Sequence, residues 1–420
     1  MNAQKAKLKL LFSAFIVLVT TFPLPVTGQQ GDSLFHRELL SDKTIQSAFR
    51  YIESNREAIV QEWIKLTEIP SPSTMEDRRA AYLREQLEAI GVDQISIDEK
   101  GNIIATLKGS GGGPTVALAA HMDTVFNVDT PIKVRREEER LYAPGVGDDT
   151  SGCIGLLWAV RALKDTGIQT KGDFLAVFTV EEELGLFGAR KFLEDWEDRL
   201  DMFVAVDGAL GGISYGALGI SWYKFIFTAE GSHTNRSAGK PNPAKAIANA
   251  ISQIYTIPLQ PPGNDFGSVY NVGLLGGGKV FNAISEESFF TVDVRSADPK
   301  KLKTMESKIQ RAAENAAELE GVRLRVERPL ILPAAQMSGA LDSAIVKTGV
   351  DVLHALGIEA ELTLRGSTDA NVAMEMGIPS ISIGAARGER SHQESEAVLI
   401  EPIYDGIRQI VLLMVSLAGH

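Results

Sequence analysis

The sequence predicts an α/β protein built on a mostly parallel sheet flanked by helices, with a smaller domain inserted into it. The first observation is a set of four apolar runs of strand length, at 116–120, 174–180, 203–206 and 380–383. Runs of this kind are typical of buried parallel strands. The second observation is that segments with helical spacing follow the first two runs, at 152–164 and 187–196. Strands that alternate with helices favour β-α-β units.

The N-terminal part of this predicted sheet domain is helical. Apolar residues recur with helical spacing at 43–67 and again at 75–90. The prolines at 70 and 72 break the pattern between the two segments, so we expect helices joined by a turn.

The pattern changes between residues 219 and 328. Tyr223, Phe225 and Phe227 alternate with other residues, as they would in a half-buried strand, and helical spacing follows at 244–255. Further segments predict strands at 269–275 and 289–295, a helix at 302–319 and a last strand at 322–326. The order β-α-β-β-α-β is that of a ferredoxin-like domain. We therefore predict a sheet domain at 29–218 and 329–420, with a lid or dimerisation domain at 219–328 inserted into it.

The first 28 residues have the character of a secretory signal peptide. Three lysines precede an apolar run at 10–19, which is short for a membrane span, and small residues follow near position 28. We therefore expect a secreted or periplasmic protein, with an uncleaved membrane anchor as the alternative. Once the leader is cleaved, no stable membrane partner is expected.

Composition restricts the chemistry. The 420 residues carry a formal net charge of −12, which disfavours contact with the phosphates of nucleic acids. A single cysteine, Cys153, excludes an intramolecular disulfide and any multi-cysteine metal site. A metal in this protein must therefore be held by histidines and carboxylates.

Polar residues of this kind follow the predicted parallel strands. His121 and Asp123 end the first, the glutamates 181–183 end the second, Asp207 ends the third, and His392 follows the fourth after a loop. Open parallel sheets gather ligands at the carboxyl ends of their strands. Two imidazoles and several carboxylates suit a hydrolytic zinc site, and Asp148 or Asp149 could bridge two metals. The residues alone do not decide which glutamate of 181–183 would bind metal.

These motifs resemble those of the aminoacylase/carboxypeptidase family of di-zinc exopeptidases, which includes peptidase T and glutamate carboxypeptidase. The resemblance covers nearly all of the chain after the leader. It is carried, in order, by HMDTV at 121–125, PGVGDD at 144–149, EELG at 182–185, VD at 206–207 and His392. Thr150 stands where the family usually has lysine.

The resemblance implies a role for each residue. One zinc would be held by His121 and Asp207 and the other by Glu183 and His392, with Asp148 bridging both. Two Zn²⁺ per subunit are expected, with Co²⁺ or Mn²⁺ as substitutes. Asp123 would orient His121, and Glu182 would be the general base. A carboxylate behind a ligating imidazole fixes its tautomer.

The resemblance also extends to the inserted domain, where His233, Asn282 and Arg295 are the expected substrate contacts. A lid histidine could stabilise the oxyanion, and Arg295 could grip a peptide carboxylate. This domain would either close over the site or pair with a second subunit in a homodimer and bring His233 to the partner's active centre.

We therefore expect a di-zinc metallo-exopeptidase acting on short peptides. Asp207 is more like the peptidase T branch, whereas many carboxypeptidases and acylases of the family have glutamate there. A di- or tripeptide aminopeptidase is thus the leading hypothesis. The alternative enzyme is a carboxypeptidase or N-acyl amino acid deacylase with the same metals. A non-catalytic peptide-binding relative is a third reading, which the complete set of ligands and base disfavours.

Overall fold

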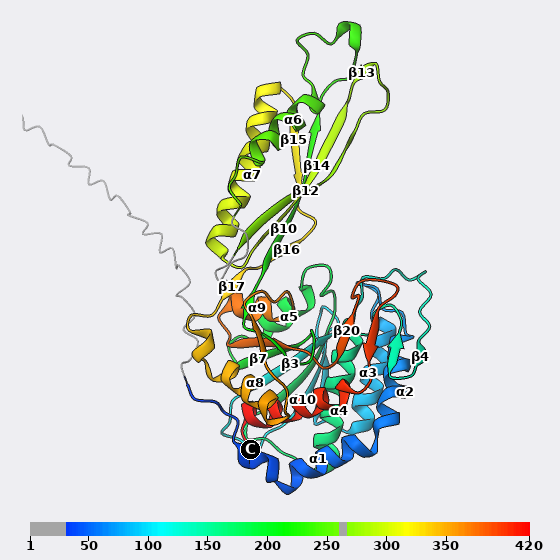
Figure 1. Ribbon diagram of the computed structural model, residues 1–420, viewed down its shortest axis with the longest axis vertical. Helices are drawn as coiled ribbons and strands as arrows, with labels where there is room; N and C mark the ends of the chain where they lie inside the picture. The colour runs from blue at the N-terminus through cyan, green and yellow to red at the C-terminus, as the bar shows by residue number, and fades with distance from the viewer. Residues whose placement is uncertain (1–30, 260–266) are drawn as a thin grey trace, which may run out of the picture.

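The computed structural model describes residues 31–259 and 267–420. The predicted leader therefore lies outside the described residues. Within the described part, none of the helices has the length and apolar character needed to cross a bilayer. A rounded body carries an elongated second unit that stands above it, as Figure 1 shows.

The body is organised around a mixed sheet that runs in the order β1-β2-β6-β3-β7-β19-β8-β18. Its central strands, β6, β3, β7 and β19, are parallel to one another, as the four apolar runs predicted. The flanking pairs β1/β2, β2/β6 and β19/β8 are antiparallel. The strands are β1 (Gln94–Ile97), β2 (Ile103–Leu107), β3 (Val116–His121), β6 (Phe174–Thr179), β7 (Met202–Val206), β8 (Gly212–Ser214), β18 (Glu361–Thr363) and β19 (Ser380–Ile383).

Helices cover both faces of this sheet (Figure 1). On one face α4 and α10 pack against β3, α3 against β1 and β2, and α8 against β19 and β8, with α1 and α2 packed on α4. On the other face α9 packs against β7 and β19 beside α5. These helices are α1 (Lys43–Ser54), α2 (Arg56–Thr67), α3 (Asp77–Ile90), α4 (Thr150–Thr166), α5 (Phe187–Trp196), α8 (Ala344–Ala355), α9 (Ala370–Met376) and α10 (Pro402–Ala418). The predicted fold class, a largely parallel sheet between helices, is confirmed.

The central helix α4 illustrates why these residues fold as they do. Its N-cap, Asp149, accepts a hydrogen bond from Gly152 N, and Gly167 ends the helix in the left-handed conformation. Nearly all of its residues are buried, because α10, α1 and α2 surround it. Asp149 also accepts a hydrogen bond from the backbone N–H of His121, so the start of α4 lies next to the carboxyl end of β3.

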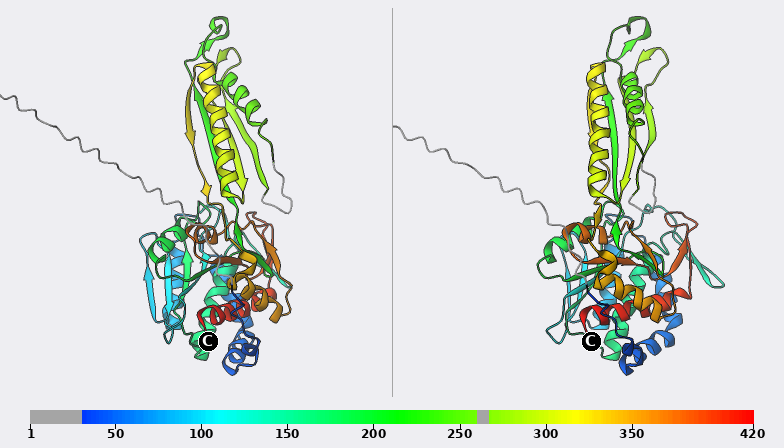
Figure 2. Two further views of the ribbon diagram at one scale, coloured as in Figure 1. Left: turned by 90° about the vertical axis from the view of Figure 1, so that its left-hand side faces the viewer. Right: turned by 60° about the vertical axis from the view of Figure 1, so that its left-hand side comes forward.

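The second unit, which we call the lid, consists of β10 (Gly219–Thr228), α6 (Pro243–Ile254), β12 (Ser268–Gly277), β14 (Glu287–Ser296), α7 (Pro299–Glu320) and β15 (Arg323–Glu327). Its antiparallel sheet has the order β12-β14-β10-β15. Helices α6 and α7 cover one face, as Figure 2 shows. Phe225, Phe227 and Phe290 lie in a hydrophobic core separate from that of the body. The predicted β-α-β-β-α-β order is present, whereas the limits 219 and 328 remain a prediction.

The chain enters and leaves the lid side by side. β9 (Gly216–Ala217) pairs with β17 (Ala335–Gln336), and the first residues of β10 pair with β16 (Ile331–Leu332). At the far end of the lid, β11 (Ser232–His233) pairs with β13 (Ala283–Ile284). A small antiparallel sheet on the body contains β20 (Arg387–Glu389), β21 (Ala397–Leu399), β5 (Arg140–Tyr142) and β4 (Arg135–Glu137).

Candidate metal centre

The predicted site residues of the body meet at the carboxyl ends of the parallel strands. His121 is the last residue of β3, the glutamates 181–183 follow β6, and Asp207 follows β7. His392 lies in the turn between β20 and β21, and Asp148 lies in the loop before α4. Because β6, β3 and β7 are adjacent and parallel, their ends bring residues distant in sequence to one place.

Two imidazoles converge on one carboxylate, that of Asp148. His121 Nε2 lies 3.1 Å from Asp148 Oδ1, and His392 Nε2 lies 3.0 Å from Asp148 Oδ2. Each carboxylate oxygen therefore faces a different ring. Glu183 completes the arrangement, with its Oε1 atom 3.2 Å from His392 Nε2. A carboxylate between two imidazoles is the geometry needed to bridge two cations.

The separations between these atoms fit metal ligands. Ligand atoms of His121, Asp148 and Glu183 all lie within 4.8 Å of one another. Ligands bound about 2.0–2.1 Å from a tetrahedral ion lie about 3.3 Å apart, close to the separations of 3.0–3.2 Å that link the two histidines, Asp148 and Glu183. Glu183 Oε1 is also buried, and its neighbour at 3.2 Å is His392 Nε2, so both atoms are available to the same ion. The donor set therefore fits zinc or a similar divalent cation.

The three consecutive glutamates have different surroundings. Glu181 pairs with Lys100 at 2.6 Å, and Glu183 faces His392. Glu182 is buried, and this burial, together with the charges of Asp207 and Glu183, raises its pKa well above the ordinary value, although His121 opposes the shift. Of these three glutamates, Glu182 is the buried one whose carboxyl has neither a lysine nor an imidazole partner among the described residues.

The charges of the site act strongly on one another. Asp207 lines the same hollow as Asp148, and burial together with the neighbouring charge of Asp148 raises the pKa of Asp207 to about 8. Hydrogen bonds to Asp148 and Glu183 raise the pKa of His392 to about 10. For His121, burial disfavours the charged ring, but the charge of Glu182 and hydrogen bonds to Asp123 and Asp148 raise its pKa. Bound cations would replace these protons.

Asp123 lies behind His121, and its carboxylate makes more contacts than the sequence suggested. His121 Nδ1 is 3.1 Å from the main-chain oxygen of Asp123 and 3.4 Å from its carboxylate. The carboxylate accepts hydrogen bonds from the backbone N–H groups of Glu182 and Glu183 and from Ser73 Oγ. Asp123 therefore holds the glutamate loop as well as the imidazole.

Several buried acids around the centre were missed in the sequence or weighed only weakly. Asp149, the weaker candidate for the bridge, accepts a hydrogen bond from the backbone of His121 in addition to capping α4. Asp369 accepts from Thr179 Oγ1, and Glu76 accepts from the backbone of Glu181. Glu396 accepts from backbone N–H groups beside Asp148. In the sequence, each of these acids is recognisable only as a carboxylate near a turn. This pattern is too frequent to identify a residue of the site.

The predicted substrate contacts of the lid lie away from this centre within one chain. His233 is exposed at the far end of the lid, where its Nε2 atom is 3.4 Å from Asn282 Nδ2 (Figure 1). Arg295 lies near the start of the lid, opposite Ile220 of β10, and pairs with Asp293 of its own strand at 2.9 Å. The structure thus brings His233 and Asn282 together but joins neither to the metal ligands.

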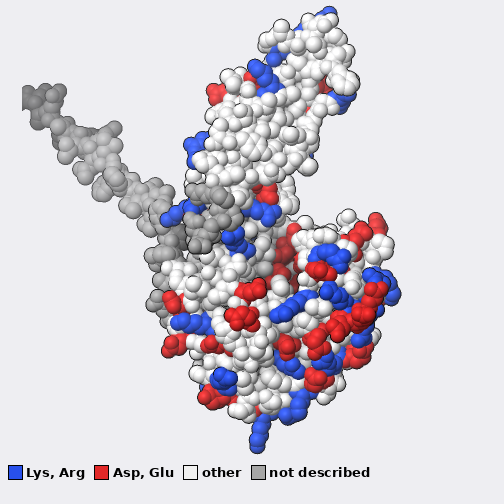
Figure 3. Space-filling model, in the orientation of Figure 1, with Lys and Arg blue, Asp and Glu red and all other residues white. Residues whose placement is uncertain are grey.

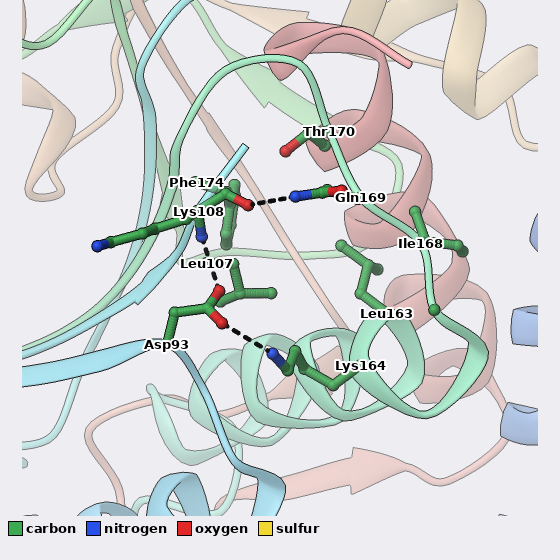
Figure 4. A pocket seen from close by; sticks show the side chains of 10 residues that line it. Asp93, Leu107, Lys108, Leu163, Lys164, Ile168, Gln169, Thr170 and Phe174 are labelled. Atoms are coloured by element: carbon green, nitrogen blue, oxygen red, sulfur yellow. Dashed lines mark hydrogen bonds and ion pairs between the residues drawn. The ribbon is translucent and has the colours of Figure 1, made fainter. Parts of the chain in front are cut away.

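Two hollows of about 230 Å³ differ in their relation to the site. One is lined by Asp148 and Asp207 together with small residues such as Gly208 and Ala209. The other, shown in Figure 4, lies at the opposite end of α4, where Asp93 pairs with Lys164. The second hollow contains none of the predicted site residues. On the face shown in Figure 3, acidic side chains are visible in the recess beneath the lid.

The fold and the cluster together define a hydrolase of the two-metal type, and comparison with known proteins agrees. Residues 117–416 match the model of peptidase family M20/M25/M40. Carboxypeptidase G2 of Pseudomonas is 25% identical over 362 residues, which cover 81% of this chain and 85% of that protein.

Solved structures show the same fold. Aminopeptidase PepT of Bacillus cereus superposes with a TM-score of 0.74 at 24% identity, over 87% of this chain and 99% of that one. YxeP of Bacillus subtilis, described as a dinuclear metal-binding peptidase, gives a TM-score of 0.65 at 19% identity over 87% and 97% of the two chains. The chain belongs to peptidase family M20/M25/M40 and is a peptide hydrolase, as the sequence motifs predicted.

Proposed function

We propose that the protein is a two-zinc exopeptidase that releases the N-terminal residue of di- and tripeptides. The observation that carries the proposal is Asp148, whose two oxygens face the imidazoles of His121 and His392. In this proposal Asp207 and His121 hold one ion, Glu183 and His392 hold the other, and Asp148 bridges them.

The surroundings of the site favour a substrate with a free amine. Asp123, Asp149, Glu182 and Asp369 are buried around the ligands in addition to the ligating carboxylates. Arg295, the residue expected to grip a C-terminal carboxylate, is paired with Asp293 instead. Two bound cations would favour the ionised forms of these acids, and the carboxylates would still leave a surplus of negative charge that attracts an ammonium group and repels a second carboxylate. These features support an aminopeptidase over a carboxypeptidase or deacylase.

Each residue has a separate part in the reaction. Bound zinc ions would supply a water of lowered pKa and polarise the scissile carbonyl. Glu182 would take the proton of that water and return it to the leaving amine, and its burial favours the protonated form that the second step needs. Asp123 would keep His121 in one tautomer and fix the backbone of Glu182.

The test compares Glu182→Gln with Glu181→Gln, a matched change in the adjacent residue whose side chain pairs with Lys100. We expect zinc-loaded Glu182→Gln to lose at least about 10²-fold in kcat on free tripeptides while retaining both metals. Glu181→Gln should remain active. Undiminished turnover of Glu182→Gln would discard the assigned base.

End-blocked peptides test the direction of cleavage. An aminopeptidase requires the free amine, so N-acetylated tripeptides should not be hydrolysed and C-amidated tripeptides should be. Hydrolysis of the N-acyl substrates would favour the carboxypeptidase or deacylase. Failure of the metal-loaded protein to cleave any member of a broad peptide library, while still binding peptides, would favour the non-catalytic relative.

We also propose that the lid pairs with the lid of a second subunit. Figure 1 shows β13 at the tip of the lid, away from the body that holds the metal ligands. Phe281 and Asn282 directly precede β13, His233 pairs with it, and all three residues are exposed. Light scattering should then give a dimer mass, and His233→Ala should lower turnover without changing metal content. A monomer that is fully active at all concentrations would contradict this arrangement.

Export to the periplasm or the exterior is a separate proposal, which rests on the lysines and the apolar run of the first 28 residues. N-terminal sequencing of protein recovered from the producing cells should find the chain beginning near Gln29. Recovery of the intact N-terminus in the membrane fraction would favour an anchor, and its recovery in the cytosol would reject export.

A further inference from the structure

One buried carboxylate, that of Glu396, is bound entirely by main-chain groups of the loop that carries Asp148. Its Oε2 atom accepts a hydrogen bond from Gly145 N at 2.8 Å, and its Oε1 atom accepts from Gly147 N and Asp148 N, both at 2.9 Å. The residue is 1% exposed, and among the described residues no lysine, arginine or histidine pairs with it. Its charge is therefore directed to the backbone of one loop.

The loop is shaped to receive this carboxylate. A Cβ atom on Gly147 would lie 2.7 Å from Glu396 Oε1, so any larger residue would displace the carboxylate. Gly145 has a φ of +70°, a conformation that favours glycine. Thr150 Oγ1 donates to Gly145 O at 2.6 Å and holds the other side of the loop. The glycines of this segment thus permit a close approach between loop and carboxylate.

Glu396 also belongs to the turn that carries His392. Glu396 N donates to Gln393 O at 3.0 Å, which closes the turn just after His392. The backbone of Ala143 in turn donates to Glu396 O, and β21 pairs with β5. Glu396 therefore connects the loop of Asp148 to the turn of His392, two residues whose side chains lie 3.0 Å apart.

We propose that Glu396 is a positioning residue that sets the place of Asp148 relative to His392, and so determines how tightly the pair of metals is held. It touches neither metal nor substrate in this arrangement. It acts through three backbone hydrogen bonds, each of which fixes the loop from which Asp148 reaches the ions. The inference rests on the proposed function, because it requires Asp148 and His392 to be metal ligands.

The test measures zinc binding as well as activity. Glu396→Gln replaces one acceptor oxygen by an amide NH₂ group, which cannot accept the N–H groups of the loop. We expect zinc affinity, measured by calorimetry on chelator-treated protein, to fall by about 10–100-fold. At limiting zinc, kcat should fall while KM for the peptide changes little. Glu394→Gln, the same change at an exposed position of the same turn, should bind zinc as the unchanged protein does.

A second variant disrupts the same contact by changing the loop instead of Glu396. Gly147→Ala should displace the carboxylate and reproduce the loss of zinc affinity, and it provides the test if Glu396→Gln does not fold. Combining the two changes should cost less than the sum of the single effects, because both remove one interaction.

The outcomes separate this inference from the proposed function. If the unchanged protein binds no zinc, the metal centre itself is wrong. If it binds two zinc ions and a folded Glu396→Gln or Gly147→Ala binds them equally well, only the positioning role is overturned. A lower melting temperature with unchanged zinc affinity would show a purely structural residue and would also overturn it.

Discussion

At the scale of single residues, the site depends on carboxylates that contact backbone N–H groups as much as on those that face the imidazoles. Asp123 fixes the backbone of Glu182 and Glu183, and Asp149 fixes that of His121. These hydrogen bonds hold the ligands in position before any metal arrives, which reduces the reorganisation needed on binding.

Replacing Asp123 by Asn tests this preorganisation. The amide group of Asn cannot accept hydrogen bonds from Ser73 and from both glutamate N–H groups as the carboxylate does. We expect zinc affinity or kcat to fall by about 10–100-fold, as is usual when the group behind a ligand is lost. Asp129→Asn, a matched change at an exposed position, is the control. Unaltered zinc binding and turnover in Asp123→Asn would argue against this role.

The sequence could predict the residues that gather in the cluster but not those that hold the cluster in place. His121, Asp207 and the glutamates are recognisable because they follow apolar strands, and parallel strands place their ends together. Glu396 and Glu76 act through backbone N–H groups of loops distant in sequence, and no spacing rule predicts such contacts. The contact between His233 and Asn282 was not predicted either, and their role as substrate contacts stays a prediction.

At the scale of elements, the four central strands, the helices α4 and α5 and the order of the lid were predicted, whereas β2 and the helices α8, α9 and α10 were not. The sequence shows continuous helical spacing over 43–67, whereas the structure has α1 and α2 with a break at Asn55. Asn55 has φ −109° and ψ 15°, outside the helical range, and apolar periodicity continues across it. The short strands β1, β4, β5, β8, β18, β20 and β21 were also missed, because they are three or four residues long.

The lid helix α7 gives a prediction at this scale. Its N-cap, Asp298, accepts hydrogen bonds from the backbones of Lys300 and Lys301, whose positive charges lie unfavourably at the positive end of the helix dipole. We expect Asp298→Ala to lower the free energy of unfolding by about 0.5–2 kcal/mol. Chemical denaturation monitored by circular dichroism measures the change. Lys303→Ala on the exposed face of α7 is the control, and a loss no greater than in this control would contradict the capping role.

At the scale of the whole molecule, the unbalanced acids of the centre predict how metal-free stability depends on pH. Burial raises the pKa of Asp369 to about 6, of Glu396 to about 7 and of Asp207 to about 8, and hydrogen bonds to Asp148 and Glu183 raise that of His392 to about 10. The folded protein therefore binds more protons than the unfolded chain above about pH 4.5, and its stability falls as pH rises.

The melting temperature of chelator-treated protein should accordingly decrease between about pH 5 and pH 8. We expect a decrease larger than about 2–4 °C, which corresponds to a loss of about 1 kcal/mol in a domain of about 150–250 residues. The zinc-loaded protein should show a smaller decrease, because the cations favour the ionised carboxylates. A metal-free melting temperature that is constant or rises across this range would contradict the electrostatic account of the site.

The paired strands where the lid leaves the body have a consequence for the ancestry and the engineering of the chain. Ala217 lies opposite Ala335 in a two-stranded antiparallel ladder. If residues 218–334 were removed, the two chain ends that remain, at Ala217 and Ala335, would therefore already be neighbours. A tight two-residue turn is the usual connection for such ends. A whole folding unit could therefore have been acquired, and could be exchanged for another, as an oversized hairpin loop, with no strand of the parallel sheet rerouted.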